Sequence, residues 1–336
     1  MITRATFRRL QARSAACSAI AVFSALAGCG VGVVPGPGSA PAAAVANGPQ
    51  LGYLWDTSDQ TLRPVLGVPG AAQIGQAVTM AGLYVNGAGS ARSGVALLQG
   101  ADGSISSMSL PLGAAQAVPG AKFIVGAQIA FSPSGTDAIL FAPGATSLLL
   151  VTGLGGSPQM QSLTTPIGFL YAAVSDTAQV ATISGSGPLS VALLTGNRSP
   201  LGPLAGFGGM SFLPSGDDLL LADSSTGVLT VIRHSSTAPA GQTFTSSAIQ
   251  APVAVAASQD GKWAVVANGG DPSAVRLDLT GATAPLRVAC ACQPTQLIPF
   301  LGNAVFSLLP LGATPNWVVD ASAATPRTVF IPAVHP

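Results

Sequence analysis

Few side chains in this 336-residue chain could perform acid–base or nucleophilic chemistry. Glutamate is absent, and histidine occurs only at His234 and His335. Neither histidine stands on an expected inner strand or completes a serine–histidine–aspartate set. The sequence therefore predicts no catalytic residue and favours a protein that is not an enzyme.

Five aspartates hold similar positions, each near the turn between two apolar segments: Asp137, Asp176, Asp217, Asp218 and Asp260. If these turns gather at one opening, their carboxylate oxygens could bind Ca²⁺. Aspartate also favours turns for its own hydrogen bonding, and the spacing of a calcium-binding loop is missing. The turn interpretation implies no cofactor, and the alternative implies Ca²⁺ as a metal ligand of these residues.

The N-terminal residues 1–28 have the layout of an export signal, in which four arginines precede an apolar stretch over residues 15–26. The stretch ends in Leu26-Ala-Gly-Cys29, which resembles the lipobox of bacterial lipoproteins. In that family the signal peptide is removed before the cysteine, whose thiol receives a diacylglycerol. The resemblance implies lipidation of Cys29 and a membrane anchor. Cleavage after Ala27 is the alternative, and it would give a secreted or periplasmic protein.

Residues 29–49 are rich in proline, glycine and alanine and carry no charge, which is typical of a tether. By the same resemblance, Gly30 after the lipid cysteine implies an outer-membrane destination. Without the leader, nine of the 13 basic residues remain against 12 aspartates, and no basic patch is visible, so nucleic acid is not an expected partner. The expected partners are the membrane, through the lipid, and an envelope protein. The chain is expected to be a monomer.

Cys290 and Cys292 would be the remaining thiols once the leader is removed and Cys29 is lipidated. Export favours oxidation, and the two cysteines have no other partner. In an extended strand their Cα atoms would lie roughly 6.6 Å apart, at the long end for a disulfide, so a bridge requires a bend. A local disulfide, a reduced pair, and a metal or redox site are the three alternatives.

A repeated phrase organises the rest of the chain. It reads Ile129-Ala-Phe-Ser-Pro-Ser-Gly135, Met210-Ser-Phe-Leu-Pro-Ser-Gly216 and Val255-Ala-Ala-Ser-Gln-Asp-Gly261, with a degenerate copy at residues 171–177. An apolar strand follows each copy. The spacing of roughly 40 to 45 residues is typical of four-stranded propeller blades. With 41 glycines, 27 prolines and 7% charged residues, the chain is predicted to be all-β, with a propeller over residues 50–336.

Seven further hairpins alternate with these phrases. The first and last match best, since Asp56 and Asp320 are each followed by an arginine seven residues later, Arg63 and Arg327. Six inner strand pairs lie between the hairpins, and two of them are expected to begin near residues 78–83 and 296–300. The count predicts seven blades with an incomplete first blade. Six blades, with the first hairpin packed outside the ring, is the alternative.

The phrase, an apolar residue and a turn that ends in glycine before a second apolar strand, resembles the YVTN/NHL/lactonase group of bacterial propellers. Some propeller hydrolases related to this group hold a divalent cation at the channel mouth through Glu, Asn and Asp. Two functions follow as expectations. One is a lipid-anchored, non-enzymatic binding or scaffold protein at the cell envelope. The alternative is a lactonase-like hydrolase that depends on a divalent cation.

Overall fold

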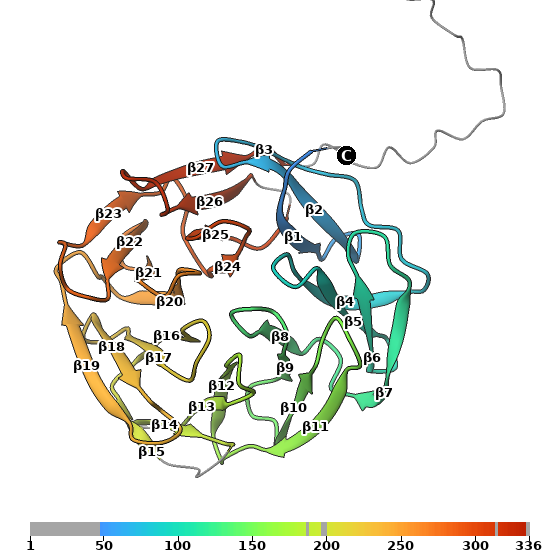
Figure 1. Cartoon of the computed structure of the whole chain (residues 1–336), viewed down its shortest axis with the longest axis horizontal. Coiled ribbons are helices and arrows are strands. Elements are labelled where there is room, and N and C mark those ends of the chain that lie inside the picture. Colours follow the sequence, from blue (N-terminus) through green and yellow to red (C-terminus); the bar gives the residue numbers. More distant parts are fainter. Residues whose placement is uncertain (1–47, 186–187, 196–199, 313–314, 334–336) are drawn as a thin grey trace, which may run out of the picture. The chain divides into compact units, whose positions relative to one another are not determined.

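The computed structural model describes residues 48–185, 188–195, 200–312 and 315–333, which form a ring of seven antiparallel sheets around a central channel (Figure 1). This is a seven-bladed β-propeller, so the predicted fold class is confirmed and the six-bladed alternative is wrong. The leader of residues 1–28 and all but the last two residues of the tether lie outside the described residues. Within the described ranges, no helix is long and apolar enough to cross a membrane.

The strands follow one another in chain order within each blade, and every neighbouring pair is antiparallel. Blade 1 contains β1 (Gln50–Asp56), β2 (Thr61–Val68) and β3 (Ala71–Ile74). Blade 2 contains β4 (Tyr84–Ser90), β5 (Val95–Gly100), β6 (Ser104–Ser109) and β7 (Ala115–Lys122). Blade 3 contains β8 (Gln128–Phe131), β9 (Ala138–Phe141), β10 (Ser147–Thr152) and β11 (Gln159–Thr164). Blade 4 contains β12 (Phe169–Val174), β13 (Val180–Ser184), β14 (Leu189–Leu193) and β15 (Pro200–Leu204). Blade 5 contains β16 (Phe207–Phe212), β17 (Leu219–Asp223), β18 (Val228–Arg233) and β19 (Ala240–Thr245). Blade 6 contains β20 (Pro252–Ala257), β21 (Trp263–Asn268), β22 (Ser273–Asp278) and β23 (Leu286–Ala289). Blade 7 contains β24 (Ile298–Pro299), β25 (Val305–Ser307), β26 (Asn316–Asp320) and β27 (Arg327–Ile331).

The second strands of the blades are buried on both faces. Every residue of β9, β13 and β17 is buried, and the apolar clusters join neighbouring blades. A single blade cannot cover both of its faces, whereas stacked blades cover one another. Continuous apolar runs therefore replace the alternation of a half-exposed strand, and the low charge of the chain reflects walls shared between blades.

The two faces of the ring differ in the connections that they carry. One carries the turns between the first and second strands of blades 2 to 7, and we call it the turn face. The other carries the connections from one blade to the next, and we call it the linker face. The innermost strands of blades 2 to 7 all run from the linker face to the turn face.

Blade 1 lacks the innermost strand. Its β3 contacts β27, the outermost strand of blade 7, as β7 contacts β11 and β23 contacts β27. Strand β1 begins at the turn face, where the carbonyl of Leu51 accepts a hydrogen bond from Leu301 N at 2.6 Å. It ends at the linker face, where Asp56 forms an isolated bridge with Leu311. The direction of β1 is thus opposite to that of an innermost strand, and β1 to β3 hold the second, third and fourth positions.

The expected inner strand near residues 78–83 is wrong, because that segment is an irregular linker and the innermost strand of blade 2 is β4. The Asn86-Gly87 pair looks like a tight turn in sequence, yet it lies within β4. A Cβ atom at Gly87 would approach the Trp55 ring to 2.7 Å. Glycine is needed here because β4 packs against β1 at short range, not because the chain turns.

Candidate functional site

The channel of the propeller contains a cavity of about 540 Å³ that residues of all seven blades line. Its wall consists mainly of apolar side chains and exposed backbone of β1 and the six innermost strands. Aromatic side chains contribute from several blades, among them Trp55, Phe131, Tyr171 and Phe207. A concave, largely apolar cavity with few polar groups is the usual form of a ligand site.

Arg92 is the one charged side chain among the described residues that line this cavity. It lies in the turn between β4 and β5, so it marks the turn-face end of the channel. Its Nη1 donates to the carbonyl of Pro133 in blade 3 at 2.8 Å, while Nε and Nη2 are buried without a hydrogen-bond partner in the described chain. Burial lowers the pKa of Arg92, and the negative charge of Asp176 opposes that change. Arg92 therefore brings a positive charge to the turn-face end of the cavity, and a positive charge favours an anionic group in a ligand.

Tyr53 and Gln296 are among the residues that line the cavity, and each carries a polar atom that is buried. Neither Tyr53 Oη nor Gln296 Nε2 has a hydrogen-bond partner among the described residues, and both atoms are buried. Burial also raises the pKa of Tyr53. The site therefore combines an apolar wall with a few hydrogen-bonding groups.

The candidate aspartates do lie on the turn face, but none of them is among the residues that line the cavity. Asp176 accepts hydrogen bonds from the turns of both neighbouring blades, through Ser134 N and Oγ, both at 2.7 Å, and Ser215 N at 2.9 Å. Burial acts to raise the pKa of Asp176, but these hydrogen bonds hold that pKa below its ordinary value. Asp176 therefore stabilises the joint between three blades.

Asp137 and Asp260 also have local partners. Asp137 accepts from Gly153 N at 3.1 Å and Asp260 from Ser258 Oγ at 2.6 Å. Burial raises the pKa of Asp137, whereas hydrogen bonds led by that of Ser258 lower the pKa of Asp260 against the opposing effect of burial. The backbone N–H of Asp260 donates to Asn303 Oδ1 at 2.9 Å, which joins blades 6 and 7.

Asp217, Asp218 and His234 form a cluster in blade 5 that could hold a metal ion, because one ligand atom of each lies within 4.8 Å of the others. Protein groups already bind both carboxylates. Asp217 Oδ2 accepts from Ser236 N at 2.8 Å, and Asp218 Oδ2 pairs with Arg233 Nη1 at 2.8 Å. A cation would have to compete with this arginine.

Cys290 and Cys292 are joined by a disulfide, with their Cα atoms 5.0 Å apart. The chain leaves β23 just before Cys290 and bends, which supplies the approach that an extended strand lacks. Cys290 N donates to the carbonyl of Pro272 at 2.9 Å, and Cys290 packs in the apolar cluster between blades 6 and 7. The pair stands on the linker face and anchors the connection to blade 7.

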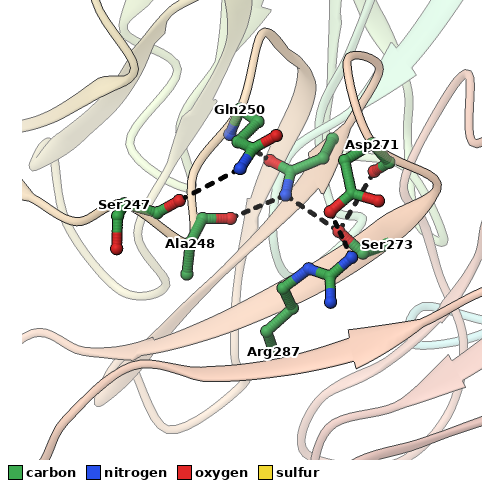
Figure 2. A network of polar contacts seen from close by, with 7 residues as sticks. Ser247, Ala248, Gln250, Asp271, Ser273 and Arg287 are labelled. Carbon is green, nitrogen blue, oxygen red and sulfur yellow. Dashed lines mark hydrogen bonds and ion pairs between the residues drawn. The ribbon is translucent and has the colours of Figure 1, made fainter.

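A polar network beside this linker shapes the turn that follows Asn268, between β21 and β22 (Figure 2). The buried Asn268 side chain donates to the carbonyl of Ala248 at 2.8 Å and to Ser273 Oγ at 2.9 Å, and it accepts from Gln250 N at 3.0 Å. Arg287 pairs with Asp271 at the edge of the network. Every polar atom of the Asn268 amide is used locally, so the network is structural.

Sequence reasoning missed Arg92 as a site residue. The signal available was its position two residues before Gly94, in a turn whose counterparts carry Pro133, Pro214 and Gln259 two residues before the glycine. His234 lies on an exposed turn far from the cavity lining, with its backbone N–H bound to Asp218 Oδ1 at 2.8 Å. His335 lies outside the described residues.

No protein-family model matches the chain, and no curated protein matches it in sequence. Solved structures do resemble it. A functionally unknown protein from Desulfotomaculum acetoxidans DSM 771 aligns with a TM-score of 0.55 at 11% identity, covering 84% of this chain and 99% of that one.

Two further structures align over less of the chain. One is a catalytically inactive virginiamycin B lyase from Staphylococcus aureus with quinupristin, at a TM-score of 0.50 and 13% identity, covering 72% of this chain and 81% of that one. The other is a chain of a mitotic checkpoint complex, at 0.50 and 14%, covering 72% and 75%. At these identities the likeness shows the fold alone: the chain is a β-propeller.

Proposed function

We propose that this protein is a lipid-anchored propeller outside the cytoplasm that binds a partner molecule at the cell envelope without transforming it. The observation that carries the proposal is the apolar cavity of about 540 Å³, lined by all seven blades, in which Arg92 is the one charged side chain that the described part of the chain contributes. Such a lining suits binding through apolar contact with one fixed polar group. The candidate aspartates, by contrast, lie outside the cavity lining and bond to protein groups, within a blade for Asp137, Asp217 and Asp218 and between blades for Asp176 and Asp260.

The anchor rests on the sequence Leu26-Ala-Gly-Cys29. Lipid on Cys29 and the residues behind it would hold the propeller near a bilayer, with the outer membrane as the proposed location because Gly30 follows the cysteine. Metabolic labelling with a radioactive fatty acid tests this. Label in the wild type and none in Cys29→Ser supports the anchor, and an unlabelled wild type released into the medium refutes it.

Binding in the cavity is tested by closing its mouth. Gln128 lines the cavity and is exposed at the start of β8, so Gln128→Trp would obstruct the channel without disturbing the core. Gln161→Trp, on exposed β11, is the matched control. Partners recovered from membranes with the wild type should be lost with Gln128→Trp and kept with Gln161→Trp. Equal recovery with both variants would place binding elsewhere.

A divalent-cation hydrolase is the second candidate, and the cluster of Asp217, Asp218 and His234 favours it. It requires that Ca²⁺ raise the unfolding temperature, that a chelator reverse the change, and that Asp217→Asn remove it. A wild type that responds to neither reagent would rule this candidate out. An equal response in Asp217→Asn would move the ion to another site.

A further inference from the structure

The missing strand of blade 1 leaves the middle of the β1 edge without a backbone partner among the described residues. Tyr53 and Leu54, which lie there, are 3% and 1% exposed, so little of this edge is accessible. Leu62 and Pro64 of β2 direct their carbonyls away from β1, to Val78 N and Gly75 N, both at 2.8 Å. They stand opposite Trp55 and Tyr53. Because hydrogen-bonding directions alternate along paired strands, the backbone N–H and carbonyl groups of Tyr53 and Trp55 must point away from β2.

Blade 7 covers the two ends of this edge but not its middle. Leu301 N binds the carbonyl of Leu51, and Leu311 bridges Asp56. Between them, residues 53–55 line the cavity. An unpaired edge is a template for another strand, and elsewhere in this ring an innermost strand fills the equivalent place.

The surroundings restrict what could pair there. The facing strand β4 contributes Gly87, Ala88 and Gly89 to the cavity lining. Because Gly87 and Gly89 have no side chain, β4 lies close to Trp55 and Tyr53 of β1. An added strand must therefore carry small apolar side chains, like the Val253-Ala-Val-Ala-Ala257 segment of β20. Running antiparallel to β1, it would end at the turn face, where Arg92 lines the cavity. Its Nε and Nη2 are buried there without a hydrogen-bond partner among the described residues.

We propose that the free edge of β1 binds the extended C-terminal segment of a partner protein, with small apolar residues paired to β1 and the terminal carboxylate at Arg92. The occupant then supplies the innermost strand of blade 1. Main-chain hydrogen bonds provide affinity, and the narrow channel and the carboxylate provide selectivity. This inference rests on the proposed function, because it names the kind of partner that the cavity holds.

The test uses fluorescein-labelled Val-Ala-Val-Ala-Ala, either as the free acid or as the C-terminal amide, with the full chain in an anisotropy titration. The free acid should bind, and amidation should weaken binding by about tenfold or more. Arg92→Gln should remove the difference between acid and amide, whereas Arg233→Gln, at an arginine paired with Asp218 outside the cavity, should keep it. If Arg92→Gln fails to fold, Arg92→Lys should preserve the preference in reduced form.

Strand addition has a second signature. Methylation of one peptide nitrogen at a time should weaken binding by about tenfold at alternate positions and little at the positions between, because only every second N–H faces β1. Equal effects at all positions overturn strand pairing, and equal affinity of acid and amide overturns the carboxylate site. Absence of binding, whether the edge stays open or another segment or copy of this chain covers it, overturns the proposal. Loss of membrane partners with Gln128→Trp in that case would leave the proposed function standing.

Discussion

Asp176 offers the sharpest test of how the blades are joined. Its carboxylate accepts three hydrogen bonds, two from Ser134 in blade 3 and one from Ser215 in blade 5. Hydrogen bonds to a charged group contribute about 1.5–3 kcal/mol each, and the half-exposed position of Asp176 reduces this through solvent screening. Asp176→Asn keeps one acceptor oxygen and turns an amide toward the other donors. We expect a loss of about 2–4 kcal/mol in the free energy of unfolding.

The stabilisation by Asp176 should also depend on pH in a defined direction. Hydrogen bonding holds the pKa of Asp176 below its ordinary value of 3.8 in the folded protein, against the opposing effect of burial. The stabilisation is therefore complete above the unfolded-state pKa and disappears as the pH falls through the lower folded-state value. The difference between wild type and Asp176→Asn should be largest near neutral pH and shrink in acid.

Urea unfolding followed by tryptophan fluorescence, near pH 7 and again below about pH 3, measures both effects. Asp102→Asn is the matched control, because Asp102 accepts from Ser104 and Lys122 on an exposed surface and joins no blades. It should change stability little. A loss in Asp176→Asn no greater than in the control, or one that does not depend on pH, would refute the role of Asp176 as a joint.

Three further predictions follow from single positions. Burial raises the pKa of Asp137, so ionisation of its carboxyl group opposes folding. In the same urea series, Asp137→Asn should therefore have a higher free energy of unfolding than wild type above that pKa, and the same free energy of unfolding below it. Gly209→Ala should lose about 3 kcal/mol, because its φ is 127° and a Cβ would meet Val255 N at 2.7 Å, whereas Gly216→Ala, with nothing within 4 Å, should be neutral. Replacing both Cys290 and Cys292 by serine should cost only about 1.5 kcal/mol, since the bridge closes a very short loop, and native wild type should show no free thiol at either position.

Much of the fold was accessible from the repeat. The phrase at residues 129–135, 210–216 and 255–261 places an innermost strand and its turn in three blades, and β8, β16 and β20 overlap these segments as expected. The strand count also predicted an incomplete first blade, with the hairpin of about residues 51–67 as its two strands. The structure adds a third strand to it, β3 (Ala71–Ile74). Local chemistry set these features, because apolar strands and turn residues recur in register with each blade.

The errors arise where tertiary contact overrides local pattern. In β4, the Asn86-Gly87 pair suggests a turn, because the sequence does not reveal that the Trp55 ring occupies the space that a side chain at position 87 would need. The turn aspartates were placed on the correct face, yet the role of Asp176 depends on donors some 40 residues away, Ser134 and Ser215. Arg92 was not singled out from the sequence, because the carbonyl that its guanidinium contacts, that of Pro133 in blade 3, lies 41 residues away.

The open edge of β1 shows how an omission can create a site in a repeat protein. Each other innermost strand uses its backbone groups on one side to pair with the next strand of its blade, and small side chains let it stand near the axis. Where that strand is missing, the same geometry leaves unpaired backbone hydrogen-bonding groups, a narrow apolar wall and a defined strand direction. A ligand need only reproduce what the chain itself supplies elsewhere, so β20 and Arg92 together specify the peptide with which the site should be tested.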